Sequence, residues 1–143
     1  MNVAPSDLEA EKSFFTGKVD SLAVTVYQNE RPLHGLAGLL DWHLQGLLSS
    51  FFRAGFIAGT KNEIVYLPIQ KGGKHLNLLL LGRGENDNPG ERLPLEDSEL
   101  KLISAKAEGL GLKNLGVSLH DFGDLSRERI EEKMKGLNLC LYH

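Results

Sequence analysis

Two apolar runs, 63–69 and 76–81, are joined by the polar turn Lys71-Gly72-Gly73-Lys74. Two strand-like runs around such a turn predict an antiparallel hairpin. Further runs at 20–27, 114–119 and 137–142 also predict strands. Segments with helical spacing follow at 97–109 and 126–135. Helices that connect separated strands favour parallel pairing, so the sequence predicts an α/β domain with a mixed sheet and helices on its faces.

The remaining long segment, 31–52, predicts a helix that is rich in glycine and poor in charge. On a helical wheel one third of the circumference is apolar and is expected to face the sheet. This face carries Leu36, Leu40, Leu44, Leu47, Leu48 and Phe51. The opposite side carries Gly38, Gly46 and Ser49 beside Trp42, which makes a poor solvent face.

Interior helix glycines cost about 1 kcal/mol each relative to alanine, so the small residues require a reason. One hypothesis is a second packed face, on which Gly38, Gly46 and Ser49 let another backbone approach and Trp42 is the anchor. The alternative is that Trp42 lies over neighbouring loops of its own domain. The two interpretations are equally compatible with the sequence.

Length and charge exclude several classes of protein. A chain of 143 residues fits one domain, 1–143, with residues 1–12 expected to form a loose tail or a short strand. The formal charge of −3 argues against a nucleic-acid partner. No apolar run approaches the roughly 20 residues that span a bilayer, so we expect no membrane segment and a cytoplasmic location. The lone Cys140, inside an apolar run, is expected to be a buried strand thiol.

No pattern of catalytic or metal-binding residues emerges. The five histidines form no i, i+4 pair, and a single cysteine cannot build a cysteine-based zinc site. We therefore expect no catalytic residue, no metal and no cofactor.

Three spaced segments carry Asp41, Trp42, Leu44, Gly46, Leu48 and Ser49, then Gly59, then Leu79, Leu80, Gly82 and Gly84. Together they resemble the N-terminal domain of the leucine aminopeptidase family, the cytosolic two-metal peptidases. The resemblance is clear from Val19 to Gly84, and the element order extends it over the rest of the chain. It implies a macro-domain-like, three-layer α/β/α fold.

In that family a separate C-terminal domain holds the two metal ions and hydrolyses peptides, so the resemblance implies a chain without peptidase activity. One segment of that catalytic domain reads N-T-D-A-E-G-R-L. The stretch NDNPGERL, 86–93, shares letters with it, but a proline and shifted spacing argue against a metal motif. We expect instead a stand-alone, non-catalytic module that associates with itself or with a protein partner.

The turn Gly82-Arg83-Gly84 offers an alternative function. A glycine-rich turn directly after a strand can aim backbone N–H groups at a phosphate, and macro domains bind ADP-ribose at such loops. A lone G-x-G is a weak signal, and here no helix follows it at once. The alternative is therefore a macro-like domain that binds a nucleotide or an ADP-ribose-type small molecule, while a structural turn is the expected role.

Overall fold

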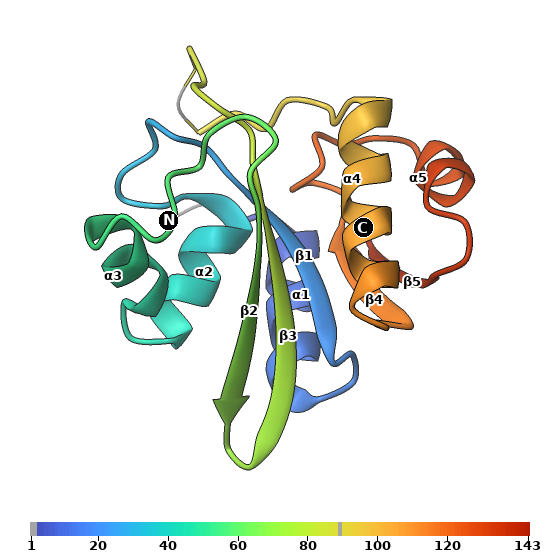
Figure 1. Cartoon of the computed structure of the whole chain (residues 1–143), viewed down its shortest axis with the longest axis horizontal. Coiled ribbons are helices and arrows are strands. Elements are labelled where there is room, and N and C mark those ends of the chain that lie inside the picture. Colours follow the sequence, from blue (N-terminus) through green and yellow to red (C-terminus); the bar gives the residue numbers. More distant parts are fainter. Residues whose placement is uncertain (1–2, 89) are drawn as a thin grey trace.

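A mixed five-stranded sheet forms the centre of the molecule in a computed structural model that describes residues 3–88 and 90–143. The strand order is β2-β3-β1-β4-β5 (Figure 1). The strands are β1 (Ser21–Val26), β2 (Ile64–Lys71), β3 (Lys74–Gly82), β4 (Asn114–Ser118) and β5 (Asn138–Tyr142). β2 and β3 form the predicted antiparallel hairpin, and β1, β3, β4 and β5 run parallel. The predicted α/β fold with a mixed sheet is confirmed.

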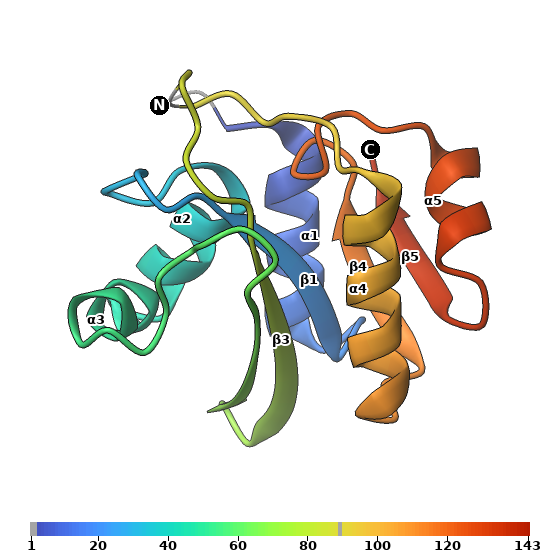
Figure 2. The ribbon, with the colours of Figure 1, turned by 45° about the horizontal axis from the view of Figure 1, so that its top comes forward.

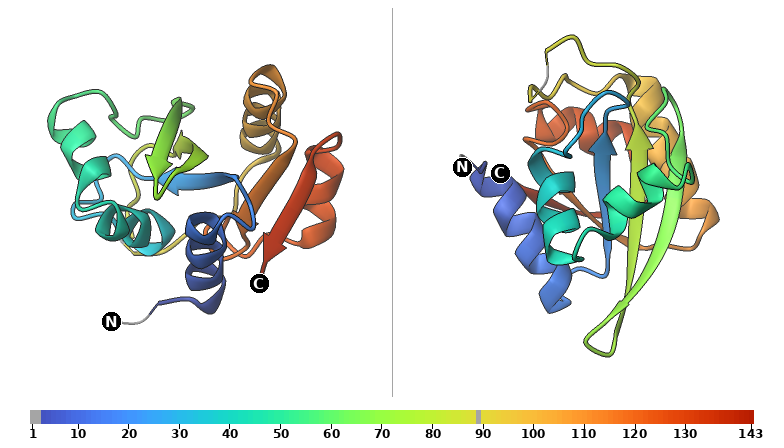
Figure 3. Two further views of the ribbon diagram at one scale, coloured as in Figure 1. Left: turned by 90° about the horizontal axis from the view of Figure 1, so that it is seen from below. Right: turned by 90° about the vertical axis from the view of Figure 1, so that its left-hand side faces the viewer.

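Helices cover both faces of the sheet (Figures 2 and 3). One layer contains α1 (Pro5–Thr16), α2 (Gly35–His43) and α3 (Leu47–Arg53), and the other contains α4 (Asp97–Gly109) and α5 (Arg127–Lys133). Alternate residues of β3 enter the two cores: Leu78 and Leu80 on the α1 side, Leu79 and Leu81 on the α4 side. A strand buried on both faces has apolar residues at consecutive positions, which explains the apolar run Leu78–Leu81. The three-layer α/β/α prediction is confirmed.

The expectation of a loose tail or a short strand over residues 1–12 is wrong for residues 5–12. These belong to α1, which begins at Pro5 and packs Ala10 and Phe14 into the core, both with no exposed surface. Proline at the first helical position and an apolar pair four residues apart are the signals that point to this helix. Met1 and Asn2 lie outside the described residues.

The helix predicted over 31–52 is divided into two. α2 ends at His43, and Gln45 and Gly46 adopt left-handed φ angles of 58° and 83° before α3 begins at Leu47. The break puts Gly46 in a turn, where a positive φ costs glycine little. The predicted sheet-facing side is confirmed for Leu36, Leu40 and Leu48, which are fully buried in the core. Leu44 and Phe51 pack against the same core and are only partly buried, whereas the half-buried Leu47 does not belong to it.

The register of β1 and β4 leaves the sheet open at one end. Their ladder contains a single residue pair, Leu22 with Gly116, whereas β1 pairs with β3 along its whole length. The last residues of β1 therefore extend past β4. The gap lies at the carboxyl ends of both strands.

We expect Phe14→Ala to lower the free energy of unfolding by about 3–5 kcal/mol, because it removes a fully buried ring of α1. Leu8→Ala, at a position on the same helix that is 52% exposed, is the matched control and should change it by less than about 0.5 kcal/mol. Urea denaturation measures both. Equally small losses would show that α1 is not part of the folded core.

Candidate functional site

The candidate site lies beyond the carboxyl ends of β1 and β4. After β1 the chain turns to α2 in one helical layer, and after β4 it turns to α5 in the other (Figure 1). Neighbouring parallel strands whose connections leave in opposite directions open a crevice, which is where ligands bind in open α/β sheets. At this end β1 and β4 share no ladder pair beyond Leu22 with Gly116.

A pocket of about 740 Å³ occupies this position between α1 and α2. Its walls include Leu33 from the loop after β1, Leu39 and Trp42 from α2, and His120 from the loop after β4. Asp7, in the first turn of α1, also lines it. The volume of this pocket lies in the range of small-molecule sites, and its mostly apolar lining with a few polar groups is also typical of them.

Trp42 stands out among the described side chains because it is a large apolar residue that is 83% exposed. The second interpretation from the sequence, that Trp42 lies over loops of its own domain, is therefore wrong. The indole forms one wall of the pocket and leaves most of its surface to solvent. Whether it meets another protein stays a prediction.

The other predicted interface residues have contacts within the chain. A Cβ on Gly38 would lie 2.6 Å from the carbonyl oxygen of Leu33, so the close backbone belongs to the same chain. Gly46 supplies the left-handed turn before α3. Ser49 donates its backbone N–H to Asp41 Oδ1 over 3.0 Å, and its hydroxyl also donates to this carboxylate, which stabilises the start of α3. An intermolecular role for these three residues remains a prediction without support from their local geometry.

Arg83, predicted in a ligand-binding turn, is buried and joins separate parts of the chain. Its guanidinium makes a bidentate pair with Glu99 of α4, with Nε to Oε2 at 2.8 Å and Nη2 to Oε1 at 3.1 Å. The same group donates to the carbonyl oxygen of Leu93 and to the Tyr27 hydroxyl. Burial works against the charge on Glu99, but hydrogen bonds from the Glu96 N–H and from Arg83 outweigh it and lower the pKa of Glu99.

The backbone of the turn is also used internally. The N–H groups of Gly82, Arg83 and Gly84 donate to the carbonyl oxygens of Glu63, Val26 and Gly59, respectively. A phosphate would have to displace these hydrogen bonds. The geometry favours the structural role of the turn, and phosphate binding by it remains a prediction.

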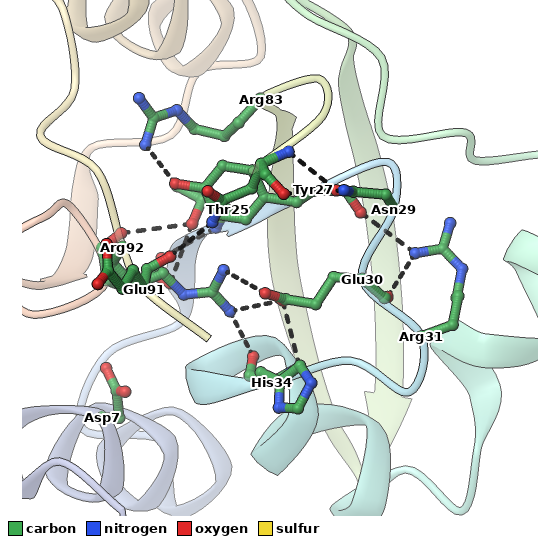
Figure 4. A network of polar contacts seen from close by, with 12 residues as sticks. Asp7, Thr25, Tyr27, Asn29, Glu30, Arg31, His34, Arg83, Glu91 and Arg92 are labelled. Atoms are coloured by element: carbon green, nitrogen blue, oxygen red, sulfur yellow. Dashed lines mark hydrogen bonds and ion pairs between the residues drawn. The ribbon is translucent and has the colours of Figure 1, made fainter. Parts of the chain in front are cut away.

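A buried polar network lies next to Asp7 and His34, two residues that line the pocket (Figure 4). Asp121 accepts the backbone N–H of Thr25 at 2.9 Å and the Thr25 hydroxyl at 3.0 Å. Its carboxylate thereby satisfies a β1 donor beyond the short β1–β4 ladder. Arg92 makes a bidentate pair with Glu30 at 2.9 and 3.2 Å, and its Nε lies 3.8 Å from Asp121 Oδ1.

Two carboxyl groups share the single guanidinium of Arg92 in this network. Burial raises the pKa of Asp121 to about 7, against the opposing effect of Arg92, and the nearby charge of Asp7 raises it further. Glu30 keeps the bidentate contact with Arg92. When Asp121 is protonated, the Glu30 carboxylate is the one negative charge of these two carboxyl groups, and it is paired with the positive guanidinium of Arg92.

The sequence did not identify the pairing of Asp7 with His120. Asp7 Oδ2 lies 3.0 Å from His120 Nδ1, and Asp7 Oδ1 accepts the Ser118 hydroxyl at 2.6 Å. The two partners are 113 positions apart, so no local spacing could join them. The available signal is that His120 and Asp121 come directly after a predicted parallel strand, at the edge where ligand sites form.

The segment 86–93 has structural contacts in place of a metal site. The backbone N–H of Asn86 donates to the side-chain oxygen of Asn29, and the backbone carbonyl of Asn86 accepts from the side-chain NH₂ of Asn29. The side-chain NH₂ of Asn86 also donates to the Glu91 carbonyl. Pro89 lies outside the described residues. Within residues 3–88 and 90–143, no three His, Cys, Asp or Glu side chains converge where a metal ion could bind. In the same ranges no helix has both the length and the apolar composition needed to cross a bilayer.

Comparisons with known proteins relate the chain to two groups. No family model matches it. Two proteins described as "Probable cytosol aminopeptidase", from Burkholderia multivorans and Burkholderia orbicola, are each 32% identical over 76 residues, which is 53% of this chain. The chain spans only 15% of the length of these relatives.

Solved structures extend the likeness over most of the fold. A tomato leucine aminopeptidase mutant matches with a TM-score of 0.54 and 20% identity, over 86% of this chain and 28% of that one. The DarG macrodomain of Thermus aquaticus matches with a TM-score of 0.62 and 12% identity, over 87% and 89% of the two chains. The DarG macrodomain of Mycobacterium tuberculosis matches with a TM-score of 0.59 and 11% identity, over 87% of this chain and 88% of that one. The fold is macro-domain-like and resembles the N-terminal region of the leucine aminopeptidases.

We expect Asp121→Asn to flatten the dependence of stability on pH. Because the pKa of Asp121 is about 7 in the fold against 3.8 for an ordinary aspartate, the folded state binds more protons between these values. Wild-type stability should therefore fall as pH rises from 4 to 7, with a slope on the order of 1 kcal/mol per pH unit. Asparagine keeps an acceptor for Thr25 and removes the titration.

Urea denaturation across this pH range measures the effect. Asp87→Asn, which removes an exposed loop carboxylate, is the control and should follow the wild-type curve. An Asp121→Asn variant with the wild-type slope would contradict the assignment of the proton to this network.

Gly38→Ala should destabilise the monomer by about 1–3 kcal/mol, because its Cβ meets the Leu33 carbonyl of the same chain. Gly109→Ala at the end of α4 is the control, since nothing lies within 4 Å of its Cβ, and it should be neutral or stabilising by up to about 1 kcal/mol. Thermal unfolding compares them. Unchanged stability with altered association would instead place Gly38 at an interface.

Proposed function

We propose that this chain, which resembles the N-terminal, macro-domain-like region of the leucine aminopeptidases, is a non-catalytic interaction module. The docking face is centred on Trp42. It binds a protein, which is either a second copy of the chain or a different protein such as a full-length aminopeptidase. The relatives named cytosol aminopeptidases support a cytosolic setting.

The exposure of Trp42 is the observation that carries this proposal. An indole that is 83% exposed leaves a large apolar area in water, which is costly unless another surface covers it. Tryptophan is also among the residues that contribute most to protein interfaces. Leu39 and Leu33 extend the apolar surface next to it in the pocket wall.

The non-catalytic part of the proposal concerns peptide hydrolysis, the activity of the family that the chain resembles. The similarity to the curated relatives covers 15% of their length. Assays with a leucine anilide and Mn²⁺ or Zn²⁺ test this part directly. Metal-dependent cleavage by the purified chain would contradict it.

Trp42→Ala should abolish association while leaving the fold intact, because the side chain is mostly in solvent. Leu110→Ala, at a 38% exposed apolar position after α4, is the matched control and should associate like the wild type. Sedimentation velocity over a range of concentrations measures self-association. Affinity capture with purified aminopeptidase measures the heterologous case. Unchanged binding by Trp42→Ala in both assays would overturn the Trp42 face.

Small-molecule binding is a second candidate, favoured by the position of the pocket at the carboxyl ends of β1 and β4. The resemblance to macro domains suggests a nucleotide or ADP-ribose-type ligand. Calorimetry with ADP-ribose, repeated on Gly84→Val, tests the ligand and the Gly82-Arg83-Gly84 turn together. Absence of heat would remove this ligand class.

A further inference from the structure

We infer that the chain forms a two-fold dimer in which Trp42 of each copy inserts into the pocket of the other. The inference rests on the proposed function, because it names the partner of the Trp42 face as a second copy of the chain. It also gives the pocket a role in the same contact. A small molecule in the pocket would compete with the partner's indole for one space.

The exposed indole and the pocket make this surface complementary to itself in shape. Trp42 is 83% exposed, and it stands directly beside a hollow of about 740 Å³, because the same residue lines the pocket wall. In a two-fold contact the same patch of both copies meets, so a protrusion on one copy faces the neighbouring hollow on the other. Rotation about an axis between the indole and the pocket therefore places each indole at the partner's pocket.

The pocket wall suits an aromatic side chain. Leu33, the half-buried Leu39 and the exposed Pro32 contribute apolar surface to it. The volume is typical of sites that hold a whole small molecule, so a single indole fits. Tryptophan side chains that fill a pocket of the partner are frequent anchors of protein interfaces. The lining thus matches the one large side chain that the same surface exposes.

The charges at the pocket do not oppose an indole. α1 and α2 begin there, and their N-cap residues Ala4 and His34 make no side-chain cap hydrogen bond. The first N–H groups of these helices give this part of the wall a positive potential, while Asp7 adds a carboxylate to it. An uncharged indole needs no counter-ion, and the electron-rich face of its ring is compatible with N–H groups.

The area of the contact indicates a transient dimer. An aromatic side chain buries about 150–250 Å². Two indoles that are 83% exposed, together with the pocket walls against them, therefore bury roughly 500–800 Å² in total. Stable complexes usually bury about 1,200–2,000 Å². We therefore expect a dissociation constant on the order of 0.1 mM.

Two variants remove the two halves of the contact separately. Trp42→Ala removes the indole and keeps the pocket. Ala4→Glu keeps the indole and puts into the pocket wall a carboxylate that an inserted indole would have to desolvate. Glutamate is favourable near the start of a helix, so α1 should stay folded. Ala105→Glu, at an exposed position of α4 in the other helical layer, makes the same change in charge and is the matched control.

The emission of the single tryptophan reports on the contact. With increasing concentration the wild type and Ala105→Glu should shift toward the blue, and Ala4→Glu should need at least about tenfold more protein for the same shift. Trp42→Ala has no tryptophan and adds nothing to this signal. An excess of Trp42→Ala should restore the blue shift of Ala4→Glu, because it offers an open pocket to the remaining indole. Two indoles that merely touched each other would not be restored in this way.

The outcomes separate this inference from the proposed function. Self-association of Ala4→Glu at wild-type strength, or no restoration by Trp42→Ala, would overturn insertion into the pocket while the Trp42 docking face stands. A wild-type chain whose emission is independent of concentration, but which binds an aminopeptidase through Trp42, would overturn the second copy as the partner and leave the proposed function intact. If Trp42→Ala changes neither self-association nor capture, both are wrong.

Discussion

The contact on which the site depends is the one between the Asp121 carboxylate and the backbone N–H of Thr25. β1 and β4 share a single ladder pair, so the end of β1 has donors that no β4 backbone satisfies. Asp121 supplies the acceptor from the loop after β4 and lets the two strands separate without leaving a buried N–H unpaired. The gap between the strands becomes the crevice that holds the pocket. Arg92 and Glu30 complete the charge balance beneath it and connect the segment after β3 to the loop before α2.

Local patterns were enough to predict most of the sheet. The β2–β3 hairpin could be predicted because its turn and both apolar runs are adjacent in sequence, and the parallel strands because helical segments separate them. The division at Gln45 and Gly46 was missed because the wheel for 31–52 remains amphipathic across the break. The Asp7–His120 pair was missed for a different reason. It joins α1 to the loop after β4, and only the three-dimensional path of the chain brings those segments together.

In a sequence, a glycine that admits another subunit and a glycine that admits its own chain look the same. In the structure Gly38 lies against the carbonyl of Leu33, and Gly46 adopts the left-handed conformation of a turn. The folding of a single chain therefore explains why both positions are glycine. The folding of a single chain does not explain why a large apolar side chain such as Trp42 is 83% exposed. The proposed interaction therefore depends on one side chain, and the pocket beside it offers the same indole to a small ligand.

The emission spectrum of Trp42, recorded from dilute to concentrated protein and again after unfolding in urea, shows whether this indole is in water in the free chain and becomes covered on association. Trp42 is the single tryptophan, so no other residue contributes. We expect the dilute folded chain to emit at almost the same wavelength as the unfolded chain, because the indole is in water in both, and to shift toward the blue when a second copy or a partner covers it. Blue-shifted emission at every dilution would mean that the chain buries its own Trp42, and the docking face would not exist.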